Sequence, residues 1–509
     1  MASVPQWLEK ATPTSFLGFL LFSLSSILLF LSLTRSKREK GTTAEAKLPP
    51  GPPKLPLIGN LHQLSKLAHR SLRDLALKYG PLMFLQLGQV PTLVVSSPAM
   101  AKAVMKTHDL SFASRPHLTS TKNLLYNSSD IAFSPYGSYW RNMRKICILE
   151  LLSIKRVESF RFVREEEVVR LMETIETSKG TVNLSHLFLS LTNNITGRIA
   201  FGRSYDKFYV LLNELQILLG GFSLGDLFPS MDWIDVLTGI QARQKKNFRE
   251  LNAFIDLVIE DHLHPRTRAS NPEFKDFVDV LLEVQKQAEL DFPFTRDNLK
   301  AVILDMFAAG TETSATVLEW TMTELMKNPN VMKKAQNEGR KVANGRQYLC
   351  DNDLCELEYL KLVMKESMRL HAPVPLLLPR ESLEKCSING YEIPKGTKVI
   401  INAWAIGRHE EAWVNPEEFR PERFIESSID YKGQDFELIP FGAGRRGCPG
   451  IAFGVASFEL ALANLLLRFD WELPRGMCPN DIDMAEEFGL TMHRKVPLSL
   501  VAIPHHQLD

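Results

Sequence analysis

The chain has 509 residues, 45% hydrophobic and 23% charged, so it can bury a large core and has the composition of a packed globular protein. Sixty basic and fifty-nine acidic residues leave a formal net charge of +1, which excludes the strongly basic balance typical of nucleic-acid-binding proteins. The six cysteines form no CxxC pair, which excludes the common zinc sites and a disulfide framework.

An uncharged apolar segment lies near the N-terminus, at residues 16–33 (FLGFLLFSLSSILLFLSL). At about 1.5 Å per residue, a helix of this length extends roughly 27 Å, which is enough to cross the thin bilayer of the endoplasmic reticulum. A cleaved signal peptide would place basic residues before the apolar run, whereas here the basic cluster, at 35–40, follows it. The pattern therefore favours a retained single-pass anchor over residues 1–34, with the N-terminus in the lumen and the remainder in the cytosol.

A proline-rich stretch, LPPGPPKLPLIGN at residues 48–60, forces extended backbone and removes helix donors. Together with the basic cluster it forms a hinge over residues 35–60. No second linker, internal repeat or low-complexity tract interrupts the sequence after it. Residues 61–509 are therefore expected to form one large domain.

The predicted elements of this domain begin with two strand-like segments, at 81–88 and 91–97. Amphipathic helical patterns then dominate to about residue 370, with clear examples at 163–175 and 248–263. Further strand-like segments lie at 385–393 and 397–404, and a long apolar helical pattern occupies 454–469. The expected fold class is mainly α with small β-sheets.

Three motifs within the helical region carry candidate functional residues. Trp140 and Arg144 are four residues apart, so they share one face of a helix. Glu366 and Arg369 share a face at i,i+3 spacing, a pairing that is common on surface helices and weak alone. The motif AGTETS at 309–314 interrupts an apolar helical run over 301–326 with a glycine, which costs about 1 kcal/mol relative to alanine, and with hydroxyls that bond helix carbonyls. Taken alone, it is most simply a packing feature.

The segment PFGAGRRGCPG at 440–450 surrounds Cys448 with glycines and with Arg445 and Arg446. Nearby positive charge stabilises a thiolate, and an apolar helical stretch that begins at Ile451 would add its N-terminal dipole. Glycines let the backbone approach a flat cofactor, and backbone N–H groups can tune the sulfur. These features suit a thiolate ligand of haem iron. A buried cysteine beside a glycine turn is the alternative, but it gives the paired arginines no role.

The residues Phe441, Gly444, Arg446, Cys448 and Gly450 match the haem-binding loop F-x-x-G-x-R-x-C-x-G of the cytochrome P450 monooxygenases, and the chain resembles this family from the anchor to the C-terminus. The hinge, AGTETS and the later segment EEFGLTMHRK look like a microsomal member of plant specialised metabolism. The resemblance implies the cytochrome P450 fold, with one haem-containing domain preceded by a single membrane anchor.

The resemblance also implies roles for individual residues. Cys448 would be the axial ligand of haem iron, with Phe441, Gly442 and Gly450 in the cofactor-binding loop and Trp140, Arg144, Arg380 and Arg446 at the haem propionates. Glu366, Arg369 and Arg423 would form a structural triad. Ala309 and Gly310 would form the oxygen-binding groove, where Glu312 and Thr313 would organise water that delivers protons, as general acids do.

The implied reaction inserts one oxygen atom of O₂ into a lipophilic small molecule, with terpenoids, phenolics, coumarins and aldoximes all open. The sequence contains no nucleotide-binding glycine motif, so NADPH would act only through an NADPH–cytochrome P450 reductase, with a cytochrome b-type protein as a second candidate donor. Arg141 and Lys145 would offer charge to that acidic partner on a face beside Arg144. The protein would be anchored in the endoplasmic reticulum membrane, and nucleic acid is not expected as a partner.

Substrate contacts are expected from five segments by their position: 119–131, 222–233, 302–309, 374–378 and 488–492. Asp305 is a candidate polar contact or a helix-packing residue. Two other functions remain open from the sequence. A haem-thiolate isomerase or dehydratase, acting for example on an aldoxime, would need no proton delivery, so Glu312 and Thr313 argue against it. A non-enzymatic haem sensor would lack turnover driven by a reductase.

Overall fold

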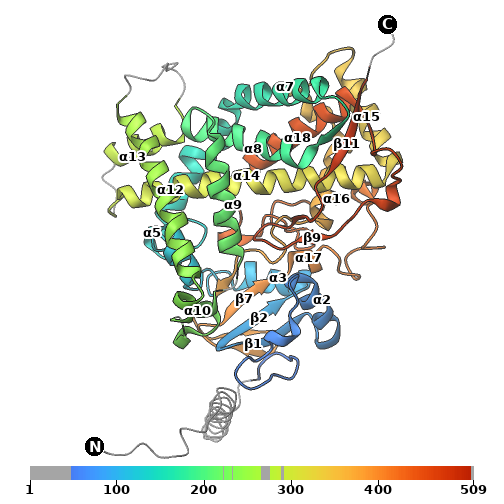
Figure 1. Cartoon of the computed structure of the whole chain (residues 1–509). Helices are drawn as coiled ribbons and strands as arrows, with labels where there is room; N and C mark the ends of the chain where they lie inside the picture. Colours follow the sequence, from blue (N-terminus) through green and yellow to red (C-terminus); the bar gives the residue numbers. More distant parts are fainter. Residues whose placement is uncertain (1–46, 222, 232, 265–274, 288–291, 506–509) are drawn as a thin grey trace, which may run out of the picture.

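The computed structural model describes residues 47–221, 223–231, 233–264, 275–287 and 292–505. The predicted anchor over 1–34 and most of the basic part of the hinge lie outside the described residues. The described chain is mainly helical and carries four small sheets, which confirms the predicted fold class (Figure 1).

Seventeen α-helices are described: α2 (Ala68–Tyr79), α3 (Pro98–Lys102), α4 (Thr119–Leu124), α5 (Ser138–Ile146), α6 (Ile154–Ser159), α7 (Arg161–Thr177), α8 (Leu184–Phe201), α9 (Asp206–Gly220), α10 (Leu224–Leu227), α11 (Ile234–Leu237), α12 (Ile240–Leu263), α13 (Phe277–Gln287), α14 (Arg296–Lys327), α15 (Pro329–Ala343), α16 (Glu358–Leu370), α17 (Ala403–Ile406) and α18 (Ile451–Arg468). Short 3₁₀ turns include η1 (Leu61–Gln63), η4 (Pro229–Met231), η6 (Asp351–Glu356), η7 (Pro421–Phe424), η8 (Gly444–Arg446) and η9 (Pro479–Asp481). Single π-helical turns extend α3 and α5, as η2 (Ala103–Thr107) and η3 (Cys147–Leu151).

The strands form four sheets in the described residues. The four-stranded sheet has the order β1 (Leu82–Leu87), β2 (Val90–Val95), β7 (Lys398–Ile401) and β4 (Arg380–Glu381), and β2–β7 is its parallel pair. The three-stranded sheet is β3 (Thr181–Asn183), β11 (Ser499–Pro504) and β8 (Phe469–Glu472). Two-stranded sheets pair β5 (Cys386–Ile388) with β6 (Tyr391–Ile393), and β9 (Glu486–Glu487) with β10 (His493–Arg494).

The sequence-based elements agree with this structure over most of their lengths. The predicted strands at 81–88 and 91–97 are β1 and β2, and the predicted helices at 163–175, 248–263 and 454–469 lie within α7, α12 and α18. The strand predicted over 397–404 is correct only in its first half. Its first part is β7, but Asn402 caps a short helix, α17, by accepting a hydrogen bond from the Ala405 N–H at 3.0 Å. An apolar run alone did not reveal that cap.

Helix α14 crosses the centre of the molecule and packs against α8, α16 and α18 (Figure 1). It begins with a capping box in which Thr295 and Asn298 exchange hydrogen bonds, so the apolar run predicted over 301–326 is only the middle of a longer helix. Both α14 and α18 are long and apolar enough to cross a membrane, yet most of each is buried inside the fold. Their hydrophobicity therefore builds the core.

The four-stranded sheet and α2 lie at one end of the molecule, at the bottom of Figure 1, with α10 beside them. The sheet contributes its own cluster of buried apolar side chains, separate from the large helical core. The loop that contains Cys448 packs onto the sheet side, since Ala443 belongs to the sheet's cluster. This arrangement places the loop between the two cores.

Candidate functional site

A cavity of about 310 Å³ is lined by α14 and by the loop before α18. Its wall on α14 includes Ala308, Ala309, Gly310, Thr313, Ser314 and Val317, and its wall on the loop includes Pro440, Phe441, Gly442, Gly447, Cys448 and Gly450. The volume lies within the usual range of small-molecule sites. The sequence had placed these two segments more than a hundred residues apart, and the structure brings them to the two sides of one space.

The Cys448 loop is a tight turn held by backbone contacts. The Cys448 N–H donates to the Phe441 carbonyl at 2.8 Å, and the Gly450 N–H points at the Cys448 Sγ at 3.3 Å. Gly444 has φ +66°, and a Cβ there would lie 2.2 Å from the Met105 carbonyl oxygen. Only glycine fits at that position.

Cys448 is exposed, but the space that it faces is the cavity. Burial raises the pKa of its thiol, whereas the Gly450 N–H and Arg144 lower it. The helix α18 begins at Ile451, so its N-terminal dipole also favours a thiolate. A sulfur in this setting is suited to hold a metal cation, because the cation offsets the cost of burying the charge.

Four arginines line the same cavity: Arg115, Arg144, Arg380 and Arg446. Burial lowers the pKa of each of them, and Arg380 and Arg144 help to lower the pKa of Arg446 to about 9. Positive charge concentrated around an apolar space fits a flat ligand with two carboxylates. With the exposed sulfur of Cys448, this donor set fits a haem group.

The sequence motifs missed Arg115, which is 5% exposed. Its guanidinium donates to the carbonyls of Ala132, Leu378 and Pro379 at 2.7–2.9 Å, so it joins segments that are far apart in sequence. A lone Arg-Pro step at 115–116 carries no periodic signal. Its position in the cavity wall could be found only from the fold.

Trp140 has protein contacts on both its polar and its aromatic side. Its indole N–H donates to the Ile131 carbonyl at 2.9 Å, and its ring lies under the Arg446 guanidinium at 4.0 Å. Trp140 thus supports Arg446 from behind, while Arg144 reaches the cavity and donates to the Gly447 carbonyl. The i,i+4 spacing placed the two residues on one helix face, but it did not reveal which of them reaches the cavity.

The polar motif of α14 is divided between two environments. Thr313 lines the cavity and its hydroxyl donates to the Ala309 carbonyl at 2.6 Å. Gly310 also lines the cavity, and a Cβ there would lie 3.3 Å from the Thr196 hydroxyl of α8. Glu312 is directed elsewhere, since its carboxylate accepts a hydrogen bond from the Thr491 hydroxyl at 2.9 Å. Thr491 lines the cavity, whereas Glu312 is not among the lining residues.

Glu366, Arg369 and Arg423 meet as a buried ionic triad. Arg369 donates to both oxygens of Glu366 at 2.7 and 2.8 Å, and Arg423 donates to one of them at 2.9 Å. Arg369 also donates to the Gly407, Pro416 and Glu418 carbonyls. The triad ties α16 to the segment before the cysteine loop, and the removal of one member would leave a buried charge without its partner.

The remaining walls are largely apolar. Of the five segments expected to contact substrate, four reach the cavity: Leu125 and Ile131, Leu304 to Ala309 in part, Val374 with Leu377 and Leu378, and Leu490 with Thr491. Described residues of the segment 222–233 are not among the lining residues, and Leu215, Gln216 and Leu219 of α9 occupy a wall instead. Helix α9 was not singled out because its apolar pattern looks like an ordinary packing face.

Asp305 lines the cavity and also fastens the loop after α4. One carboxylate oxygen accepts from the Ile131 and Ala132 N–H groups at 2.6 and 3.3 Å. Burial, and then the nearby Asp130, raise the pKa of Asp305 well above its ordinary value. The two interpretations of Asp305 from the sequence are therefore both compatible with its position.

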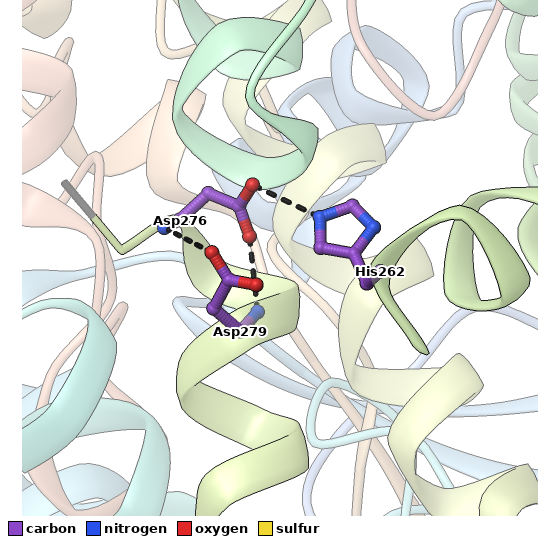
Figure 2. A group of neighbouring side chains, drawn as sticks. All are labelled: His262, Asp276 and Asp279. Atoms are coloured by element: carbon purple, nitrogen blue, oxygen red, sulfur yellow. Dashed lines mark hydrogen bonds and ion pairs between the residues drawn. The ribbon is translucent and has the colours of Figure 1, made fainter. Parts of the chain in front are cut away.

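A second cluster of polar side chains joins α12 to α13 (Figure 2). Asp276 and Asp279 exchange hydrogen bonds with each other's backbone N–H groups at 3.0 and 3.3 Å, which is a capping box at the start of α13. His262 contacts the Asp276 carboxylate at 3.0 Å and the Val258 carbonyl at 2.6 Å. The residue types could bind a metal ion, but the contacts drawn cap the start of α13 and, through His262 and Asp276, join it to α12.

Arg141 and Lys145 are exposed on α5, beside the face that carries Arg144. Arg141 lies over the Tyr136 ring at 5.8 Å. These two cations are available to a macromolecular partner, as the sequence predicts for residues rotated away from the cavity face.

The comparisons with known proteins agree on one family. The family model described as cytochrome P450 matches residues 49–499. The chain is 52% identical to cytochrome P450 71AP13 of Prunus mume, covering 98% of this chain and 99% of that one, and 49% identical to strychnine-11-hydroxylase of Strychnos nux-vomica, covering 96% and 97%. A solved zebra fish cytochrome P450 structure with progesterone is similar at a TM-score of 0.74 and 26% identity, covering 86% of this chain and 99% of that one.

Proposed function

Because this chain belongs to the cytochrome P450 family and is a haem-thiolate monooxygenase of plant specialised metabolism, we propose that Cys448 is the residue that binds the haem iron. The observation that carries this assignment is the Cys448 sulfur exposed at the wall of a cavity that is also lined by three buried arginines and the half-buried Arg144. The iron supplies the chemistry of O₂ activation, using electrons from a reductase.

The arginines would orient the cofactor. Arg144, Arg380 and Arg446 bind its carboxylates in this proposal, with Arg115 as a fourth cation and Trp140 supporting Arg446. Arg144 would exchange its bond to the Gly447 carbonyl for a charge-assisted one, which is stronger. Phe441, Gly442 and Gly450 would pack beside the ring, since they line the same wall.

Glu312 and Thr313 would deliver protons to the cavity. The Thr313 hydroxyl gives up its bond to the Ala309 carbonyl and donates into the cavity, where Gly310 leaves room on α14. Glu312 would supply the proton, with the Thr491 hydroxyl as its hydrogen-bond partner. General acid catalysis of this kind contributes on the order of 10² to 10⁴ in rate.

The walls support a lipophilic substrate of small size. Apolar side chains from α9, α14 and the loop after α4 make up much of the wall away from the arginines, and Gln216 and Asp305 are among its polar groups. Terpenoids, phenolics, coumarins and aldoximes all fit that description. Dehydration of an aldoxime is not favoured, because relatives are named as hydroxylases and monooxygenases and this chain retains Thr313 at the cavity.

An NADPH–cytochrome P450 reductase, or a cytochrome b-type protein, would dock on the face that carries Arg141 and Lys145. Exposure of both cations supports this, since an acidic partner is steered toward exposed positive charge. The cofactor side of the cavity lies behind the same helix, through Arg144.

We place the protein on the endoplasmic reticulum membrane through the segment 16–33, with the domain in the cytosol. Exposed apolar side chains support this: Leu55, Leu57 and Ile58 in the hinge, and Met231, Trp233, Val236 and Leu237 around α11. The β1–β2 turn contacts the first group and the segment that leads into the second: Gly88 N–H donates to the Ile58 carbonyl at 3.2 Å, and the Gln89 side-chain amide donates to the Ser230 hydroxyl, next to Met231, at 2.9 Å. A hydrophobic surface of this kind is typical of a membrane contact.

The thiolate assignment is tested by changing Cys448. In the Cys448→His protein the reduced carbon monoxide complex should lose the long-wavelength Soret band that a thiolate ligand gives. The control is Cys355→Ser, because Cys355 is an exposed cysteine outside the cavity lining, whose thiol donates to the Asn352 carbonyl. An unchanged spectrum in Cys448→His would refute the assignment.

A further inference from the structure

One face of α14 is covered by the short hairpin of β9 and β10. Helical spacing puts Glu312, Thr316, Glu319 and Thr323 on this face. The hairpin meets each of them in turn, through Thr491 to Glu312 at 2.9 Å, His493 to Thr316 at 2.8 Å, the Arg494 N–H to Glu319 at 3.3 Å and the Arg494 guanidinium to Thr323 at 3.0 Å. The hairpin thus contacts all four of these polar side chains, and Ser185 of α8 donates a further hydrogen bond to Glu319.

The first of these contacts form a continuous chain of hydrogen bonds. The Thr491 hydroxyl donates its proton to the Glu312 carboxylate, and the same oxygen lies 2.8 Å from the His493 Nε2. Because the hydroxyl has only one proton, the Nε2–H of His493 must donate to it. Imidazole, hydroxyl and carboxylate are thus aligned donor to acceptor in one direction, toward Glu312.

Thr316 allows His493 to change its charge. The hydroxyls of Thr311, Thr313, Thr321 and Thr323 all donate to the carbonyl four residues earlier, whereas the Thr316 hydroxyl meets the His493 Nδ1. A hydroxyl can accept from Nδ1–H when the ring is charged and donate to Nδ1 when the ring is neutral. Both protonation states of His493 therefore keep their hydrogen bonds, which removes the usual penalty for an unsatisfied buried group.

Of the three members of the chain, His493 is the most exposed to solvent. The His493 side chain is 35% exposed, the Glu312 side chain is 5% exposed, and Thr491 is buried at 2%. Since Thr491 also lines the cavity, the chain runs from solvent to the wall of the active site. A carboxylate that delivers protons into a closed cavity needs such a source after each turnover.

The charges around His493 favour the protonated ring. Glu312 and Glu319 face it from α14, Glu487 is its partner across the β9–β10 pair and is itself bound to Lys66, and Arg494 follows it on β10. Burial lowers the pKa of His493, but the Glu312 carboxylate, 3.7 Å from Nε2, and the charge of Glu319 outweigh it, and the pKa is raised. The ring is therefore charged to a higher pH than an ordinary histidine.

We propose that His493 takes up protons from solvent and passes them through the Thr491 hydroxyl to Glu312, a step that rests on the proposed role of Glu312. In this step the His493 Nε2–H bond breaks as its proton joins the Thr491 oxygen, while the original hydroxyl proton joins the Glu312 carboxylate. The imidazolium becomes neutral, Glu312 becomes a neutral acid, and bulk water then returns a proton to the ring. His493 touches neither substrate nor cofactor, so it is a positioning and supply residue.

The first test measures His493 itself in the full-length protein. Histidine ring resonances are followed against pH in the diamagnetic ferrous carbon monoxide form, and His493 is assigned by its loss in His493→Gln. We expect a pKa above that of an ordinary histidine, and a lower pKa in Glu312→Gln. The matched control, Thr323→Val, removes a different hydrogen bond of the same hairpin and should leave that pKa unchanged. A His493 that stays neutral, or that ignores Glu312→Gln, overturns the proposal.

The second test measures product, peroxide and NADPH on one sample. Removing one relay member typically costs less than the whole general-acid effect, because water substitutes in part, so His493→Gln should give on the order of 10-fold less product per NADPH, with more peroxide. In the wild type this ratio should fall as the pH rises through the pKa of His493, and in His493→Gln it should be flat. Thr323→Val should behave as the wild type.

The variants distinguish a failure of the proton-uptake route through His493 from a failure of the proposed role of Glu312. If Glu312→Gln is uncoupled and His493→Gln is not, the uptake route is wrong and the role of Glu312 stands. If Glu312→Gln is fully coupled, the proposed role of Glu312 fails. If His493→Gln does not load haem, Thr491→Val and Thr491→Ser decide: only the variant without a hydroxyl should be uncoupled, and equal coupling in the two overturns the route.

Discussion

Gly444 shows how one residue holds the cysteine loop in place. Its left-handed φ of +66° strains any other residue, and its missing Cβ makes room for the Met105 carbonyl of η2. The N–H of the next residue, Arg445, then reaches the Asp109 carboxylate at 3.0 Å. The backbone of the loop thus packs directly against the segment after α3, at a distance that leaves no space for a side chain at position 444.

Gly444→Ala should therefore prevent stable loading of the cofactor. Backbone strain of about 1–2 kcal/mol adds to an overpacking cost of similar size, so we expect a loss on the order of 3 kcal/mol in the free energy of unfolding. Gly180→Ala is the matched control, because Gly180 has φ +87° but nothing within 4 Å of the added Cβ. Gly180→Ala should lower the free energy of unfolding only by the backbone strain, about 1–2 kcal/mol. Denaturant unfolding and the yield of the reduced carbon monoxide band measure both variants, and equal losses in the two would contradict the steric argument.

Sequence motifs identified residues whose partners are near them in the chain or in a fixed loop. Glu366 and Arg369 share a helix face, and the glycines around Cys448 mark its turn. Sequence motifs did not identify Arg115 or His493. Arg115 bonds the distant Leu378 carbonyl and His493 bonds the distant Thr316, and a single histidine in a two-residue strand has no distinctive spacing. The bond from Thr313 to the Ala309 carbonyl was foreseen as the simple packing interpretation, and the structure contains it.

Among the elements, the hairpin of β9 and β10 is fastened at both ends. Glu486 of β9 accepts from Arg70 at 2.7 Å and contacts His69 at 3.0 Å, which joins the hairpin to α2. Burial by itself would raise the pKa of Glu486, but His69 and Arg70 lower it to about 2. A carboxyl whose pKa is lower in the folded protein stabilises the fold above its ordinary pKa of 4.5 and loses that contribution as the pH falls toward 2.

Glu486→Gln should accordingly lower the free energy of unfolding at neutral pH by about 1–3 kcal/mol. The gap between wild type and variant should shrink as the pH falls, since the wild-type carboxyl is then protonated. Urea unfolding followed by tryptophan fluorescence at a series of pH values gives the comparison. Glu487→Gln is the control, because the Glu487–Lys66 pair is exposed and should contribute little. A gap that stays constant down to acid pH would show that charge is not its origin.

Element types were predictable where periodicity is long, and element ends were not. The apolar run in α14 revealed a helix, but its first turn depends on the exchange of hydrogen bonds between Thr295 and Asn298. The strand-like segment before α17 ended early because Asn402 caps a helix. The hairpin of β9 and β10 has two residues in each strand, too few for any pattern of alternation.

At the scale of the whole molecule, the orientation at the membrane can be tested with residues that the structure leaves accessible. Asn127 and Asn183 are exposed and Asn194 is half-buried, and each lies in an Asn-x-Ser/Thr sequence that the lumenal glycosylation machinery uses. A domain held in the cytosol never meets that machinery.

The full-length protein from eukaryotic membranes should therefore carry no glycan at these positions. Mass change on glycosidase treatment is the measurement. As a control, replacement of residues 1–34 by a cleavable signal peptide sends the domain into the lumen and should add glycan, at Asn127 and Asn183 first. Glycosidase-sensitive mass on the unmodified chain would contradict the proposed orientation.

The parallel pairing of β2 with β7 determines when the four-stranded sheet can form during synthesis of the chain. Val94 pairs with Ile400, so the inner edge of β2 stays open until the ribosome has made the C-terminal third of the chain. An open strand edge invites pairing with another chain, and contacts between distant residues form late. During synthesis the N-terminal hairpin thus waits with its backbone groups unpaired while the helices are produced. A pause or truncation before residue 398 leaves it without its partner, so premature termination should yield aggregation-prone chains rather than a smaller folded protein.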